Sequence, residues 1–188
     1  MWQDDETNQP EMSDDNKPFS LIRQFTIEVV GTAVRAGILA FLIIYFVAQT
    51  NIVHGYSMEP NLHENQRIIV EKVSYRFTQP ARGDIVVVDV ADSDVPLIKR
   101  VIGLPGETVG IINGQLVVNE QVLNEPYLSP FPTYNYPMTL VPEGHIFVMG
   151  DNRPVSRDSR SFGAVSLDAV RGHAWVSYWP IEDLGVLK

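Results

Sequence analysis

Cysteine is absent from the 188-residue sequence, so the chain forms neither a disulfide bond nor a thiolate metal site. The chain also lacks an excess of positive charge, because 23 acidic residues outnumber 14 basic ones and the formal net charge is −9. Six of the acids precede the first basic residue, Lys17, and the rest of the chain carries 17 acids and 14 bases. This balance provides no basic surface for a nucleic acid, and we expect no nucleic-acid partner.

Patterns typical of a metal site are missing as well. None of the four histidines has a context typical of catalysis, and we expect structural or exposed positions for His54, His63, His145 and His173. Asp151 and Asp158 lie in a polar stretch, but they lack the alternating ligand spacing of a calcium loop. We therefore predict neither a metal ion nor a cofactor.

A long apolar run follows a polar start of the chain. Residues 1–25 begin with Asp, Glu, Asn, Gln, Ser and Pro, and we interpret them as an acidic disordered tail. Residues 29–48, VVGTAVRAGILAFLIIYFVA, are interrupted only by Arg35. Twenty helical residues span about 30 Å, the thickness of the hydrocarbon core of a bilayer. We predict a transmembrane anchor over residues 26–50.

The alternative for this run is a buried helix of a soluble domain, which Arg35 would suit. Arg35 nevertheless lies in the first third of the run, where a long side chain can reach the interface, and Glu28 lies on the same helical face. A cleavable secretory signal fits less well, because a long acidic stretch precedes the run and no small-x-small cleavage site ends it. The few flanking bases leave the orientation undetermined.

Residues 51–188 have the pattern of a mainly β domain with mostly antiparallel strands. Short runs rich in Val, Ile and aromatic residues are bounded by Gly, Pro, Asn or Asp, and these runs are RIIVEKV, DIVVVDV, PLIKRVIGL, HIFVMG and HAWVSYW. The stretch VGIINGQLVVN adds a predicted hairpin, because Asn113 and Gly114 suit the positive φ angles of a type I′ turn.

Residues 123–144 interrupt this pattern with five prolines, at positions 126, 130, 132, 137 and 142. Proline cannot donate a ladder hydrogen bond, so we expect an extended surface excursion rather than central strands. Aromatic residues alternate with the prolines. They either contact a partner or lipid, or pack down on the sheet, and packing is the expectation we favour.

Two residues in the β region are candidates for chemistry. Ser57 lies between Gly55 and Pro60, nine residues after the apolar run ends at Ala48, and is either a turn or cap residue or a nucleophile. A serine nucleophile needs a base to take its proton. Lys99 belongs to PLIKRVIGL, and burial among aliphatic neighbours would lower its pKa enough for that role. The alternative for Lys99 is an exposed lysine at a sheet edge.

The polar stretch GDNRPVSRDSR, residues 150–160, directly follows the strand run HIFVM. Such a stretch is usually a solvated loop whose ion pairs contribute little to stability. It also supplies two hydroxyls, those of Ser156 and Ser159, that can bond an amine. Asp158 and Arg160 form a carboxylate–guanidinium pair that can fix the shape of the loop.

The order of these segments resembles the type I signal peptidases, also called leader peptidases. An apolar anchor is followed by SMEPNL, RGDIVVV, KRVIGLPGE and GDNRPVSRDSR, and the resemblance extends to about Trp179. The acidic tail and the proline-rich excursion lie outside the motifs. The resemblance implies Ser57 as nucleophile, Lys99 as general base and Ser156 as the residue that orients the lysine.

The same resemblance implies that Asp158 and Arg160 support the site, and that the RGD stretch at residues 82–84 is architectural. It also implies a cell-membrane endopeptidase that removes signal peptides from secreted preproteins through an acyl-enzyme. The acidic tail would be cytoplasmic, and the β domain, held by a single-pass anchor, would lie on the outer side. Membrane lipid and preproteins are then the expected partners, and the oligomeric state stays open.

Two positions depart from the family pattern. Asn61 replaces a threonine that commonly follows the proline, and Asn suits the same turn. Gly55 stands where some members have a serine that donates to the oxyanion, so the oxyanion hole would depend mainly on the backbone N–H of Ser57. Loss of such a donor can cost about 10² in rate.

Two rival interpretations remain. The self-cleaving repressors with a Ser-Lys pair have a related β core, but they carry a DNA-binding helical domain where this chain has its apolar run. An anchored scaffold or substrate-binding relative without activity would keep the fold and lose the reaction. The presence of Ser57 and Lys99 argues against such a loss.

Overall fold

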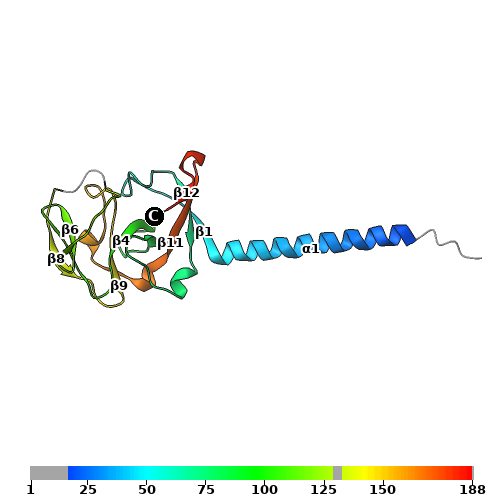
Figure 1. The fold of residues 1–188 in the computed structure, drawn as a ribbon, viewed down its shortest axis with the longest axis horizontal. Coiled ribbons are helices and arrows are strands. Elements are labelled where there is room, and N and C mark those ends of the chain that lie inside the picture. The colour runs from blue at the N-terminus through cyan, green and yellow to red at the C-terminus, as the bar shows by residue number, and fades with distance from the viewer. Residues whose placement is uncertain (1–16, 129–132, 188) are drawn as a thin grey trace, which may run out of the picture. The chain divides into compact units, whose positions relative to one another are not determined.

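The structure, a computed structural model, describes residues 17–128 and 133–187 (Figure 1). The chain divides into two units, residues 1–43 and 44–188. The first unit contains most of one long helix, and the second contains two β-sheets. The fold class is confirmed as mainly β with antiparallel strands and an N-terminal apolar helix.

Helix α1 runs over Lys17–Val47 and is 31 residues long. Its segment Ile22–Leu42 is long and apolar enough to cross a membrane, and none of the most apolar part is buried inside the structure. Arg35 turns its side chain back along the helix, where Nε donates to the carbonyl of Gly31 at 3.0 Å. This direction leads toward the N-terminal end of the helix, as expected of an arginine that reaches for an interface.

The boundaries of the helix correct two predictions. Residues 17–25 were assigned to the disordered tail, yet they are helical, because Pro18 is compatible with a first helical turn and helix formation propagates cooperatively. The predicted anchor reached residue 50, but β1 begins at Ala48. The polar run Gln49–Asn51 favours strand pairing over a further helical turn. The tail prediction for residues 1–16 lies outside the described residues.

The larger sheet has eight strands in the order β1-β2-β11-β3-β4-β9-β10, with β12 paired to β11. Every pairing in it is antiparallel. Its strands are β1 (Ala48–Ile52), β2 (Arg67–Glu71), β3 (Ile85–Val88), β4 (Leu97–Gly103), β9 (His145–Met149), β10 (Val165–Ser166), β11 (Val170–Trp179) and β12 (Gly185–Val186). The five runs read as strands from the sequence therefore became β2, β3, β4, β9 and β11.

The smaller sheet has four strands in the order β7-β6-β5-β8. Its strands are β5 (Thr108–Ile112), β6 (Gln115–Val118), β7 (Gln121–Val122) and β8 (Tyr136–Leu140). Asn113 has φ 50° and Gly114 has φ 79°, and they join β5 to β6 with Ile112 opposite Gln115. The predicted hairpin and its turn residues are confirmed.

The proline-rich segment contains a strand that the sequence analysis did not predict. Its second half forms strand β8, and Pro137 is tolerated there because β8 is an edge strand of the smaller sheet. In its first half Glu125 and Leu128 are buried. Tyr134 and Tyr136 pack against the core between the sheets, so the favoured packing of the aromatics is confirmed for them. Residues 129–132 lie outside the described residues.

Strand β4 has buried residues on both faces because β3 and β9 flank it and apolar clusters cover it. Lys99 lies opposite Val86 of β3, and Arg100 lies opposite Met149 of β9. The remaining helices are short, namely α2 (Ser159–Phe162) and the 3₁₀ turns Ser74–Arg76, Leu167–Ala169 and Ile181–Asp183. The interior of the larger sheet thus holds two consecutive cationic side chains.

Candidate active site

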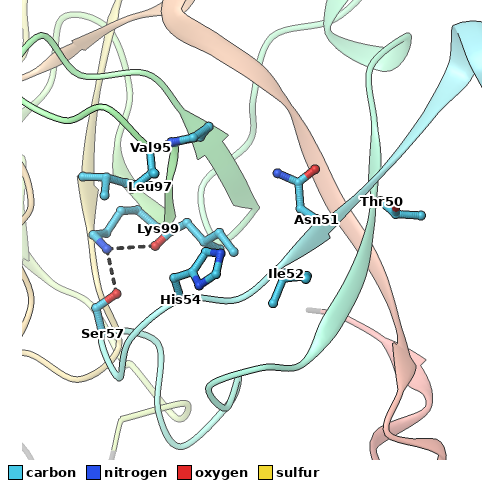
Figure 2. A pocket seen from close by; sticks show the side chains of 10 residues that line it. Thr50, Asn51, Ile52, His54, Ser57, Val95, Leu97 and Lys99 are labelled. Atoms are coloured by element: carbon cyan, nitrogen blue, oxygen red, sulfur yellow. Dashed lines mark hydrogen bonds between the residues drawn. The ribbon is translucent and has the colours of Figure 1, made fainter.

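Ser57 and Lys99 meet in the structure. The Nζ atom of Lys99 donates to the Oγ atom of Ser57 at 2.7 Å and to the carbonyl oxygen of Ile98 at 2.9 Å, as Figure 2 shows. Lys99 is only 3% exposed, since β4 is an internal strand. The alternative of an exposed lysine at a sheet edge is therefore wrong.

Ser57 lies in the loop between β1 and β2, and its neighbours hold that loop in place. Met58 and Leu62 are buried in the core of the larger sheet, and the N–H groups of Asn61 and Leu62 donate to the carbonyl of Met58. Gly55 has φ +76°, a conformation that glycine adopts without strain. The core thus fixes the chain on the C-terminal side of the serine, while glycine turns it on the other side.

Burial lowers the pKa of Lys99 to about 8. Loss of hydration is the largest cause, because it disfavours the charged amine, and the charge of Arg160 acts in the same direction. The carboxylates of Asp158 and Asp151 oppose it by raising the pKa. With a pKa near 8, about a tenth of Lys99 is neutral at pH 7, against fewer than one in a thousand for an ordinary lysine.

The loop after β9 lies against the backbone of Ser57. The N–H of Asn152 donates to the carbonyl oxygen of Ser57 at 3.0 Å. Gly150 makes this approach possible, because a Cβ atom at its position would collide with Ser57 O and with Ser156 Oγ. Here glycine is required by space rather than by its φ angle.

Asp158 and Arg160 form the pair suggested by the sequence. Arg160 donates through Nε to Asp158 Oδ1 and through Nη2 to Asp158 Oδ2, both at 2.7 Å. The fully buried Asp158 also accepts from the N–H of Gly150 at 3.0 Å. Arg160 Nη2 further donates to the carbonyl of Arg153 at 2.8 Å. The pair therefore joins both ends of the loop that contacts Ser57.

Ser156 does not bond Lys99 in the part of the chain that the structure describes. Its Oγ atom is buried and has no hydrogen-bond partner there. A buried hydroxyl without a partner loses the hydration that it has in water and gains no bond in exchange. The hydroxyl lies next to the position that a Cβ of Gly150 would occupy, as does the carbonyl of Ser57.

The sequence did not reveal a buried network of charged side chains that lies next to Lys99 in the structure. Arg100 donates through Nε and Nη2 to the two oxygens of Asp151, at 2.9 and 2.7 Å, and both side chains are almost fully buried. Asn61 Nδ2 donates to Asp151 Oδ2 at 2.9 Å. Two consecutive cations inside a strand with apolar neighbours on both sides would have been the signal, because buried charges need partners.

A pocket of about 330 Å³ opens beside Ser57 and Lys99. Strand β1 contributes Thr50–Ile52 to one side, and the segment Val95–Ile98 contributes another, as Figure 2 shows in part. His54 also lines this pocket and is exposed, as expected from the sequence. Among the described residues, no three His, Asp or Glu side chains are grouped to hold a metal ion.

Comparison with known proteins bears on this arrangement. The family described as "Signal peptidase, peptidase S26" matches residues 26–179, most of the chain. The chain belongs to this family. The signal peptidase match covers the apolar helix from residue 26 onward, the loop of Ser57, strand β4 and the loop after β9.

Several curated signal peptidases are similar over most of their length. "Probable signal peptidase I-2" from Synechocystis is 41% identical over 167 residues, which are 86% of this chain and 77% of the relative. Signal peptidase I from Leptolyngbya laminosa is 40% identical over 86% of this chain and 82% of its own. Signal peptidase I T from Bacillus subtilis is 36% identical over 81% of this chain and 85% of its own length. A crystal structure of a signal peptidase I from Enterococcus faecalis is 36% identical, with a TM-score of 0.45 over 51% of this chain and 97% of that one.

Proposed function

We propose that this signal peptidase is a membrane-anchored serine endopeptidase in which Ser57 is the nucleophile and Lys99 is the general base. Its substrates are secreted preproteins, and its product is the mature protein freed of its signal peptide. The observation that carries this proposal is the 2.7 Å hydrogen bond between Ser57 Oγ and a buried lysine whose pKa falls to about 8. Geometry and proton affinity together suit general-base catalysis.

The reaction has two halves that use the same lysine. Neutral Lys99 takes the proton of Ser57 as Oγ attacks the carbonyl carbon of the scissile bond. The ammonium of Lys99 then gives that proton to the nitrogen of the leaving chain as the C–N bond breaks. Water next attacks the acyl-enzyme, with Lys99 again as base, and the hydroxyl of Ser57 is restored. The bond to the carbonyl of Ile98 keeps Nζ aimed during both halves.

Stabilisation of the oxyanion falls to the backbone in this proposal. Gly55 offers no hydroxyl at the position where a donating side chain would lie. The N–H of Ser57 has no acceptor among the described residues, so it is available to an oxyanion that forms on the substrate carbonyl. Preorganised donors of this kind contribute strongly to acyl transfer.

Three further residues support the dyad in this proposal. The hydroxyl of Ser156 has no hydrogen-bond partner among the described residues. It accepts a hydrogen bond from the ammonium of Lys99 after Nζ has taken the proton and moved away from Ser57. Asp158 and Arg160 hold the loop that carries Ser156 and contacts Ser57. The substrate chain lies extended in the pocket between Thr50–Ile52 and Val95–Ile98, with small side chains before the scissile bond.

Helix α1 serves as the anchor in this proposal. The chain passes from its last residue, Val47, to Ser57 within ten residues, so anchor and nucleophile belong to one short stretch. Preproteins are held in the bilayer by their own apolar segment, and an anchored enzyme meets them by a search in the membrane plane. The acidic tail would be cytoplasmic and the β domain would lie on the outer side.

Cleavage of a preprotein by the purified full-length chain in detergent tests the proposal. The unmodified chain should remove the signal peptide, whereas Ser57→Ala and Lys99→Met should each lower kcat by at least about 10³ while the protein stays folded. Retained cleavage by either variant would require another mechanism. No cleavage by the unmodified chain would instead favour a scaffold or an inactive relative.

A further inference from the structure

The first part of the proline-rich segment contacts both halves of the catalytic centre. We name residues 125–128, Glu-Pro-Tyr-Leu, the brace segment. Glu125 and Leu128 are buried, at 4% and 5% exposure, although the segment belongs to a loop. A carboxylate that is almost fully buried is rare unless it is paired, so its partner indicates what the segment does.

The partner of Glu125 is Arg153, in the loop that lies against Ser57. The guanidinium of Arg153 is 2% exposed and donates through Nη1 to Glu125 Oε2 at 3.2 Å and through Nη2 to Glu125 Oε1. Its Nε donates to the carbonyl of Gly150 at 3.0 Å. Glu125 thus holds the cation that fixes Gly150, and the following residues of that loop include Asn152, whose N–H binds the carbonyl of Ser57.

Tyr127 reaches the other half of the centre. Its ring lies 4.1 Å below the guanidinium of Arg100, which directly follows Lys99 in β4 and pairs with Asp151. Its hydroxyl donates to Glu125 Oε1 at 2.7 Å, and burial raises the pKa of Tyr127, so the hydroxyl stays a donor. Its backbone carbonyl accepts from Asn61 Nδ2 at 2.9 Å, within the loop of the nucleophile.

The brace segment therefore has one contact on each element that carries a catalytic group. Glu125 contacts Arg153, which belongs to the loop after β9. Tyr127 contacts Arg100 in strand β4 and Asn61 in the loop between β1 and β2. None of these contacts reaches the pocket, since no brace residue lines it.

We propose that Glu125 and Tyr127 are positioning residues that keep Ser57 and Lys99 at hydrogen-bond distance by holding Arg153 and Arg100 in place. This inference rests on the proposed function of the dyad. When Glu125 loses its charge, Arg153 is left as a buried cation without a counter-ion and must move or admit water. The loop behind Ser57 then shifts, and the reacting atoms lose alignment while the pocket keeps its shape.

The test compares the kinetics of full-length variants on one synthetic preprotein whose signal segment ends in Ala-x-Ala. Glu125→Gln preserves the size of the side chain, and we expect kcat to fall about 10- to 100-fold while KM changes less than about threefold. Tyr127→Leu, which removes the ring below Arg100, should lower kcat about fivefold or more. Tyr127→Phe, which keeps the ring, should lie between Tyr127→Leu and the unmodified chain.

The matched control is Glu107→Gln, which breaks the partly buried pair of Glu107 with Arg82 at 2.6 Å. Glu107 bonds Arg82 and the N–H of Leu104 and, among the residues that the structure describes, does not bond the loop behind Ser57. This variant should therefore lose stability without a comparable loss of kcat. Thermal melting of each variant gives the folded fraction. If Glu125→Gln does not fold, Tyr127→Leu and Tyr127→Phe still decide the outcome.

Unchanged kcat in folded Glu125→Gln, or in Tyr127→Leu where the former does not fold, would overturn the positioning role. If kcat of Glu125→Gln falls only as much as kcat of Glu107→Gln, the brace segment only stabilises the fold. That result would also overturn the positioning role. Absence of cleavage by the unmodified chain would instead reject the proposed function, so the two failures are distinguishable.

Discussion

The carbonyl oxygen of Ser57 accepts a hydrogen bond from the N–H of Asn152 across 3.0 Å. This bond fastens the loop between β1 and β2 to the loop after β9, although the two are far apart in sequence. The side chain of Ser57 is then free to face Lys99, because the backbone rather than the side chain makes this contact. The backbone of Ser57 is thus held on the side away from Lys99.

Substitution of Gly150 tests how tightly that contact is packed. Gly150→Ala adds a Cβ that collides with Ser57 O and Ser156 Oγ, so the loop must move away from the nucleophile. We expect kcat to fall at least about 100-fold and the free energy of unfolding to fall by about 1–3 kcal/mol. Gly185→Ala is the control, because a Cβ there meets nothing within 4 Å, and it should change neither quantity.

The pH dependence of kcat/KM reports the state of the lysine. In the proposed mechanism Lys99 must be neutral to take the proton of Ser57, and its pKa is lowered to about 8. We expect kcat/KM to rise about tenfold per pH unit below pH 8 and to level off above it, as measured by initial rates of preprotein cleavage. A profile that is flat between pH 6 and pH 9 would exclude Lys99 as the titrating base.

Removal of the lysine should stabilise the fold. Burial lowers the pKa of Lys99 from 10.5 to about 8, so below pH 8 its folded state carries a charge at a cost of about 3 kcal/mol. The unfolded chain binds more protons than the folded chain between about pH 8 and pH 10.5, so stability rises with pH in that window.

Lys99→Met removes this cost and should therefore raise the free energy of unfolding at pH 7 by up to about 3 kcal/mol. The gain should shrink toward pH 10.5. Urea unfolding at pH 7 and at pH 10 measures it, with Lys72→Met as a control at a lysine outside the pocket. A loss of stability at pH 7 would show that the hydrogen bonds of Lys99 Nζ stabilise the fold by more than the burial of its charge destabilises it.

Ser156→Ala separates a role in the reaction from a role in stability. The hydroxyl is buried without a partner, so its removal should leave the fold as stable or make it more stable by about 1 kcal/mol. If Ser156 receives the lysine ammonium during the reaction, kcat should nevertheless fall about 10- to 100-fold. Thermal melting and steady-state rates, measured on the same preparation, give both numbers. If the Ser156→Ala variant melts at a lower temperature and its kcat falls only as far as the unfolded fraction explains, Ser156 would have a role in the fold alone.

Local patterns in the sequence predicted most of the secondary structure. Alternation of Val, Ile and polar residues located the long strands, and the Asn113–Gly114 pair located a hairpin, because both signals depend on nearby residues. The start of α1 was missed, since a cooperative helix extends beyond its apolar part. Strand β8 was missed because Pro137 suits an edge strand, and edges are set by the whole sheet.

The candidate site was predictable only in part, because several of its contacts join residues that are far apart in the sequence. Ser57 and Lys99 are identified by residue type and by family motif, and the structure brings them together. The partners of the buried charges were not predictable, because Arg100 meets Asp151 and Arg153 meets Glu125 only after distant strands have been placed. Pairing over such separations leaves no periodic signal in the sequence.

Under the proposed function, the internal position of β4 determines when in folding Lys99 can act as a base. Lys99 loses its hydration only after β3 and β9 have closed on either side, and Ser57 acquires its backing only from the loop that follows β9. A nascent chain that has emerged only as far as β4 therefore contains both Ser57 and Lys99 and, under the proposed function, has no proteolytic power. The two side chains come together only when the later part of the chain has folded onto the earlier part.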